Sequence, residues 1–134
     1  MIAIEPDPEL GRAFDAAGGS GKPRIGQIGV AYDTDTKAAV TRAHEQFRWF
    51  AGGWKVNSEL PGPSAFDAAS QFVRDDDIEE QIPCGADVGA VVDAVGKFAD
   101  AGFTHVAIVQ IGGDHQQAFI DWAEKELLAA LRHL

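Results

Sequence analysis

The chain has 134 residues, of which 46% are hydrophobic and 24% are charged, and its formal net charge is −10. This composition is typical of one soluble globular domain, and the acidic balance argues against binding to nucleic acid or to an anionic membrane. The only cysteine, Cys84, rules out a disulfide framework and a cysteine-based metal motif, which suits a reducing cytoplasm.

The chain opens on alternating strand and helix patterns. Residues 1–4 form a short apolar run that predicts a strand, and Asp7 followed by Pro8 predicts the start of a helix. The apolar face of this helix is Leu10, Ala13, Phe14 and Ala17, and glycines 18, 19 and 21 stop it. The run RIGQIGVAY, residues 24–32, predicts a second strand.

The middle of the chain predicts a helix and then a long excursion. The helix starts at Asp33 or Asp35 and places Val40, Ala43, Phe47 and Phe50 at helical spacing before Gly52 and Gly53 end it. Residues 54–77 are expected to be irregular, with a short helix over residues 64–72. A long excursion inside a compact unit is often functional.

The last third predicts a helix, a strand and a final helix. The first of these helices has the apolar stripe Val88, Val91, Val92, Val95 and Phe98, and Gly102 caps its end. Residues 104–111 (THVAIVQI) predict a parallel strand covered on both faces. Asp114 is expected to cap the final helix with Gln117, and the buried stripe of that helix is Ile120, Ala123, Leu127, Leu131 and Leu134.

The order of elements is βα, then βα with an insertion and an extra helix, then βα. Three parallel strands cannot close a barrel. The predicted fold class is therefore α/β, a partial (β/α)8 TIM barrel that spans residues 1–134 and supplies roughly the last three βα units.

Two glycine-rich segments invite comparison with known anion-binding motifs, and only the second is placed where such a motif could work. GGSGKP, residues 18–23, lacks the first glycine and the final Ser or Thr of a phosphate loop, and it lies between a helix and a strand in the wrong order. Gly112-Gly113-Asp114-His115 follows the last strand, on the face where barrel enzymes place their chemistry. Either its amides hold an anion, or the glycines make a tight turn. Gln110 and His115 are candidate pocket-lining groups in either case.

Other polar and aromatic clusters leave alternatives open. Glu5 and Asp7 either form a carboxylate pair for acid–base work or serve as a loop residue and a cap. The aromatic run of residues 47–50 with Trp54 either walls a flat ring system, with Lys55 meeting an anionic group, or packs under the loop. The acidic run of residues 75–80 does not match a calcium loop, and the four histidines lack zinc-site spacing, so no metal site is predicted.

The chain resembles the closing segment of the luciferase-like (LLM class) oxidoreductases. The resemblance lies in GADVG at residues 85–89, AGFTHV at residues 101–106 and the terminal FIDWAEKELLAALRHL. The segments IAIEPDPEL, KPRIGQIGVAYD, EQFRWFAGGWKVNSELPGP and QFVRDDDIEEQIPCG look like the deazaflavin branch, whose members use coenzyme F420.

The resemblance implies that residues 1–134 are the C-terminal part of a longer F420-dependent enzyme. The family's catalytic groups and main cofactor contacts lie in its earlier units, so no catalytic residue is assigned here and F420 would be bound mostly outside this chain. Lys55 resembles a phosphate-binding lysine of the sugar-phosphate branch. Asp7, Glu79 and Glu80 stand where cations would be expected, which argues against a sugar-phosphate substrate.

The sequence therefore predicts the C-terminal part of a cytoplasmic F420-dependent oxidoreductase that moves a hydride between deazaflavin and an organic small molecule. Its substrate-binding candidates are Lys55, Gln110 and His115. One alternative is a non-catalytic half-barrel that acts by association with itself or a partner, because open edge strands favour pairing and homo-oligomers. Another is an FMN-dependent luciferase-like monooxygenase. No apolar run is long enough to span a membrane, and residues 1–10 lack the pattern of a signal peptide.

Overall fold

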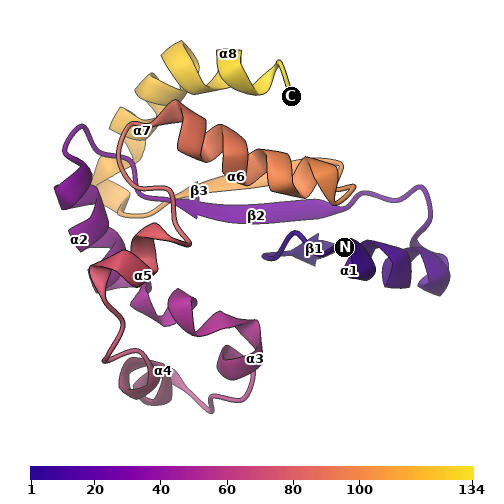
Figure 1. The fold of residues 1–134 in the computed structure, drawn as a ribbon, viewed down its shortest axis with the longest axis horizontal. Coiled ribbons are helices and arrows are strands. Elements are labelled where there is room, and N and C mark those ends of the chain that lie inside the picture. Colours follow the sequence, from indigo (N-terminus) through magenta and orange to yellow (C-terminus); the bar gives the residue numbers. More distant parts are fainter. The chain divides into compact units, whose positions relative to one another are not determined.

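The computed structural model describes residues 1–134. Its strands are β1 (Ile2–Ala3), β2 (Ile25–Val30) and β3 (His105–Gln110) (Figure 1). Its α-helices are α1 (Pro8–Phe14), α2 (Thr36–Phe47), α3 (Gly53–Asn57), α4 (Pro63–Ala69), α5 (Asp75–Glu79), α6 (Val88–Asp100), α7 (Gln116–Trp122) and α8 (Leu128–Leu131). Short 3-10 or π turns lie at Asp15–Gly19, Arg48–Gly52, Gly113–His115 and Ala123–Leu127.

Local sequence signals place several element ends as expected. Asp7 accepts a hydrogen bond from the amide of Glu9 at 2.8 Å and caps α1, and Pro8 occupies the first turn. Asp35, rather than Asp33, caps α2. Gly102 has a φ of +80°, the left-handed conformation that commonly follows a helix end.

The chain divides into two compact units. Unit 1 consists of Met1–Val30, Asp87–Val109 and Ile120–Leu134, and unit 2 consists of Ala31–Ala86 and Gln110–Phe119. Each unit is therefore built from segments that are distant in the sequence.

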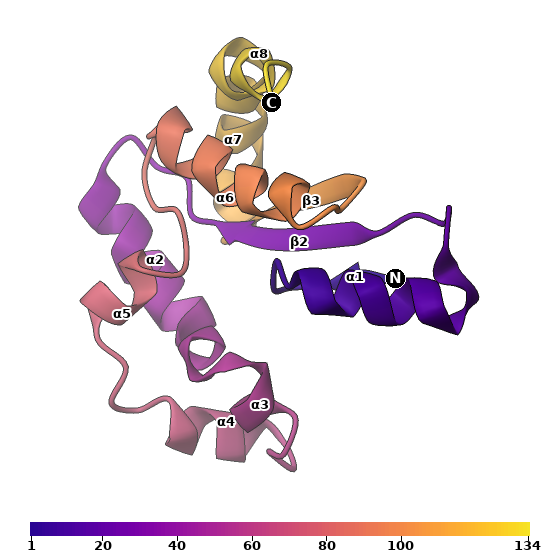
Figure 2. The ribbon, with the colours of Figure 1, turned by 45° about the vertical axis from the view of Figure 1, so that its right-hand side comes forward.

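Unit 1 contains a parallel sheet in the order β1-β2-β3. Ile2 pairs with Ile25 and Ala3 with Gly26. Helix α6 packs against β2 (Figure 2). The contact is close, since a Cβ atom on Gly26 would lie 2.3 Å from the ring of Phe98.

Strand β3 is covered on one face, and this corrects the expectation of cover on both. His105, Ala107 and Val109 are exposed, while Val106 and Ile108 are half-buried. The latter two share a small cavity with residues of α6 and α8. The face of β3 that carries Val106 and Ile108 is therefore the one that helices α6 and α8 cover.

Two predicted helix faces are also corrected. On α1, Leu10 is 41% exposed, and Gly11 is the buried residue. On the final helical segment, Ile120 and Leu134 are exposed, whereas Trp122 and Leu127 are buried. Helical spacing identified an apolar stripe in each case, but the packing partner decides which part of the stripe leaves water.

Unit 2 has its own apolar core. It is formed by buried residues of the segment after β2, of α2, of α5 and the segment after it, and of the segment after β3: Ala31, Ala39, Ala43, Ile78, Ile82 and Ile111. Phe47 and Phe50 pack against this core, as the spacing predicted. A parallel bridge between Ala31 and Cys84 brings the end of the insertion back to the end of β2.

The insertion is more regular than expected. Residues 54–77 contain part of α3, all of α4 and the start of α5 in place of one short helix in an irregular loop. Helix α5 packs on α2 and buries Ile78 completely. No helix of the chain is both long and apolar enough to cross a membrane.

Candidate functional site

A polar cluster lies in unit 2 where the ends of β2 and β3 lead into the following helices. The segment after β2 supplies Asp33, α2 supplies Arg42, and the end of β3 and the turn after it supply Gln110 and His115. These are the carboxyl ends of parallel strands, where α/β barrels place their chemistry. The cluster is therefore the first candidate functional site.

Arg42 is the centre of this cluster. Its Nε donates to the carbonyl of Ile111 at 3.2 Å, and its Nη2 donates to the carbonyl of Tyr32 at 2.6 Å. Its Nη1 donates to Asp33 Oδ2 at 3.1 Å. The Arg42 side chain is only 11% exposed, so this arginine joins the two strand ends and is not displayed to solvent.

Asp33 is the carboxylate partner of Arg42. Its Oδ1 accepts the amide of Asp35 at 3.1 Å. The hydrogen bond from the Asp35 amide, followed by that from Arg42, holds the pKa of Asp33 below its usual value of 3.8. Asp33 is therefore an anion at neutral pH and balances the charge of Arg42.

Gln110 and His115, both predicted as pocket-lining groups, contact this cluster. Gln110 Oε1 accepts the amide of Tyr32 at 3.0 Å, and its Nε2 donates to the carbonyl of Ile111 at 2.8 Å. His115 Nε2 lies 3.0 Å from Arg42 Nη1, and His115 Nδ1 lies 3.5 Å from Asp33 Oδ2.

The contacts of His115 assign its tautomer. A guanidinium group only donates hydrogen bonds, so Nε2 must accept from Arg42 and the proton of the neutral ring lies on Nδ1, facing Asp33. An Asp–His pair of this kind orients an imidazole. Because Arg42 contacts Nε2, that nitrogen is not available to hydrogen-bond a ligand in this conformation.

The Gly-Gly turn serves this arrangement. Gly112 has a φ of +96°, and a Cβ atom there would lie 2.5 Å from Cδ of Arg42. Asp114 lies inside the 3-10 turn and not at its cap, which corrects the expected capping role. The tight-turn interpretation of this segment is therefore the one that the geometry favours.

Lys55, the third predicted site residue, is not part of the cluster. It lies on the short helix α3, its side chain is exposed, and its ammonium group makes no ion pair. The structure thus brings together two of the three predicted residues and leaves Lys55 on the insertion.

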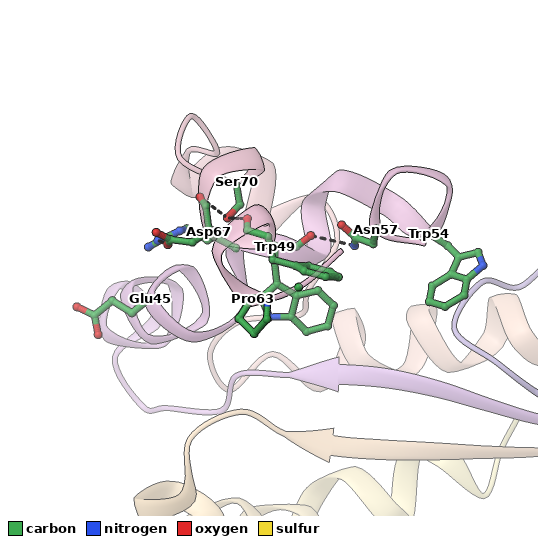
Figure 3. Close-up of a pocket in the computed structure, with 10 residues that line it drawn as sticks. Glu45, Trp49, Trp54, Asn57, Pro63, Asp67 and Ser70 are labelled. Carbon is green, nitrogen blue, oxygen red and sulfur yellow. Dashed lines mark hydrogen bonds and ion pairs between the residues drawn. The ribbon is translucent and has the colours of Figure 1, made fainter. Parts of the chain in front are cut away.

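A second feature of unit 2 is a cavity of about 540 Å³ within the insertion and α2 (Figure 3). Its walls include Trp49, Trp54, Phe66 and Pro63. The Trp49 ring also packs against Phe47 and Phe66, at centroid distances of 5.0 and 6.0 Å. Trp49 therefore packs under the loop, as one interpretation of the aromatic run expected, and it also walls a cavity.

The sequence pattern gave no separate signal for Arg42 and Asp33 as site residues. The available hint was the position of Arg42 at the edge of a buried stripe, three residues after Ala39 and one before Ala43. A charged residue at such a position needs buried partners.

Cys84 is half-buried, and burial together with the nearby Glu79 raises the pKa of its thiol to about 11.

Comparisons with known proteins give a structural likeness alone. The chain matches no protein-family model and no curated protein. Among solved structures it is similar to an F420-dependent secondary alcohol dehydrogenase in complex with an F420-acetone adduct, with a TM-score of 0.68 and 23% sequence identity. The match covers 97% of this chain and 41% of the dehydrogenase, so the chain spans about two fifths of that enzyme's length.

The likeness and the observed sheet together establish the fold class. The chain is α/β with a three-stranded parallel sheet, and it matches part of a (β/α)8 barrel. The partial-barrel prediction is confirmed.

Proposed function

We propose that the chain is the C-terminal part of an F420-dependent oxidoreductase of the luciferase-like family, in which a hydride passes between deazaflavin and an organic substrate. The main support is the structural match, which covers 97% of this chain. The matched enzyme is F420-dependent. The segments that resemble the deazaflavin branch agree with it. A deazaflavin, when bound, supplies or accepts the hydride.

In this proposal the residues of the chain position the substrate side of the site. Arg42 and Asp33 fix the two strand ends and hold the ring of His115 in one orientation. Gln110 and His115 would line the substrate side, and the free ammonium of Lys55 would meet an anionic part of the substrate. The donors of Arg42 and Gln110 are engaged within the chain, which fits a supporting role better than a cofactor cradle.

The test is a chimera in which this chain replaces the matched segment of the secondary alcohol dehydrogenase. We expect the folded chimera to bind F420 and to prefer F420 to FMN. The fluorescence of each cofactor measures its binding. For the isolated chain, the dissociation constant for F420 should be larger than about 1 μM. A folded chimera without F420 affinity, or tight F420 binding by the isolated chain, would refute the proposal.

A second candidate function has its own observation. Val109 on β3 is 40% exposed, Ile2 on β1 is 71% exposed, and these are the two end strands of the sheet. Such edges favour pairing, so the chain could act as a non-catalytic half-barrel that associates with itself or with a partner. Sedimentation velocity at low protein concentration distinguishes a monomer from an associated form. A stable monomer would count against this candidate.

A further inference from the structure

We propose that the cavity of unit 2 binds an uncharged, largely apolar small molecule whose planar ring lies against Trp54 and Trp49. The proposed function assigns no ligand to this cavity, and the inference does not depend on the identity of a cofactor. It rests on the size of the cavity, on its aromatic walls and on the way in which its polar groups are used.

The cavity has the size and surface of a small-molecule site. Its volume of about 540 Å³ suits a ligand of two or three rings. The Trp54 indole is 61% exposed, although it is among the largest apolar groups of the chain. Because covering an exposed indole removes apolar surface from water, a flat ring placed on Trp54 would be stabilised there.

One wall of the cavity is preorganised. Trp49 contacts Phe50 and Phe66 edge to face, at centroid distances of 6.0 Å in each case. Asn57 donates from Nδ2 to the carbonyl of Trp49 at 3.1 Å. Figure 3 shows Trp54 set apart from Trp49 on a different helix. The Trp49 wall is therefore already ordered before a ligand enters, and ligand binding need not fix it.

The polar groups of the lining favour a ligand without charge. Arg48 is paired with Asp67, so their charges cancel. Ser70 donates its hydroxyl to the carbonyl of Phe66 at 2.8 Å. The Glu45 side chain points away from Trp49 in Figure 3. An anion would find no free cation in the lining of this cavity.

The experiment uses two probes that differ by one charged group. N-phenyl-1-naphthylamine is uncharged, and 1-anilinonaphthalene-8-sulfonate has the same rings with a sulfonate. Each is titrated into the full chain while the probe emission and the quenching of tryptophan are followed. We expect saturable binding of the uncharged probe to one site and at least about tenfold weaker binding of the sulfonate.

Variants then locate the site. Trp54→Ala should weaken binding of the uncharged probe by about tenfold or more, and Trp54→Phe should weaken it less. Because Trp54 is exposed, neither change should unfold the chain, which circular dichroism checks. Phe72→Ala is the matched control, since Phe72 is 83% exposed and does not line the cavity.

The outcomes are distinct. Loss of binding in Trp54→Ala with unchanged binding in Phe72→Ala supports the proposal. Binding that does not saturate, an equal loss in both alanine variants, or equal affinity for the two probes overturns it.

Discussion

At the scale of single residues, Arg42 links segments that are far apart in the sequence. It donates to two backbone carbonyls and to Asp33, and it contacts His115. Gln110 and His115 could be predicted because residues that follow a parallel strand lie at one edge of the sheet. Arg42 and Asp33 could not, because their role depends on which carbonyls the fold brings within reach.

Removing the Arg42 side chain should destabilise the chain substantially. Arg42→Ala leaves Asp33 and the carbonyls of Tyr32 and Ile111 without their donor. We expect a loss of about 2–4 kcal/mol in the free energy of unfolding, measured by urea denaturation. The control is Arg12→Ala, which breaks only the exposed Glu9–Arg12 pair and should leave the urea midpoint almost unchanged. Equal midpoints for the two variants would contradict this assignment.

The lowered pKa of Asp33 predicts a pH dependence of stability. Its pKa in the folded chain lies below the usual 3.8, so the folded chain holds the proton less tightly than the unfolded chain. The resulting stabilisation is present above about pH 4 and is lost as the pH falls through the folded pKa. Urea midpoints between about pH 6 and pH 3 should fall less steeply in Asp33→Asn than in the unchanged protein. An identical slope would show that Asp33 gains nothing from its partners.

At the scale of elements, the sequence predicted where helices start and stop better than it predicted which of their residues are buried. Asp7 and Asp35 cap the starts of α1 and α2, and Gly102 follows the end of α6; each acts through bonds within a few residues, so local spacing identifies it. The faces of α1 and of the last helical segment were predicted wrongly because burial depends on a distant partner. The insertion was underestimated because its helices are short and depend on packing, as Ile78 of α5 does against α2.

The contact between α6 and β2 predicts a sharp size limit at Gly26. In Gly26→Ala the new methyl group would lie 2.3 Å from the buried ring of Phe98, so the helix or the ring must move. We expect a loss of about 1–3 kcal/mol in unfolding free energy. Gly113→Ala is the matched control, because its added methyl group meets nothing within 4 Å. Equal midpoints of thermal unfolding for the two variants would contradict the close packing of α6 on β2.

At the scale of the whole molecule, exposed apolar side chains and a high negative charge act against each other. Ile2, Val109, Ile120 and Leu134 are between 40% and 71% exposed, which favours association. The net charge of −10 opposes it by mutual repulsion between copies. The balance should therefore depend on salt.

We expect the average mass in solution to rise with ionic strength. Between about 0.01 and 0.5 M sodium chloride the range of charge repulsion contracts several-fold, while apolar contacts persist. Light scattering coupled to size exclusion measures the mass directly. Val109→Lys should hold the chain at a lower mass in high salt by placing a charge on β3, and Gln71→Lys, also exposed, controls for the added charge. A mass independent of salt would argue against apolar self-association.

The hydrogen bond from the Tyr32 amide to Gln110 Oε1 has a consequence for dynamics. A side chain 78 residues away shields this backbone proton from solvent, so the rate at which it exchanges for deuterium reports on Gln110. A ligand that draws Gln110 toward itself would release the Tyr32 amide and speed its exchange. A ligand that leaves Gln110 in place would not. The amide of Tyr32 is thus a built-in sensor of events at the strand ends, readable without a label or a turnover assay.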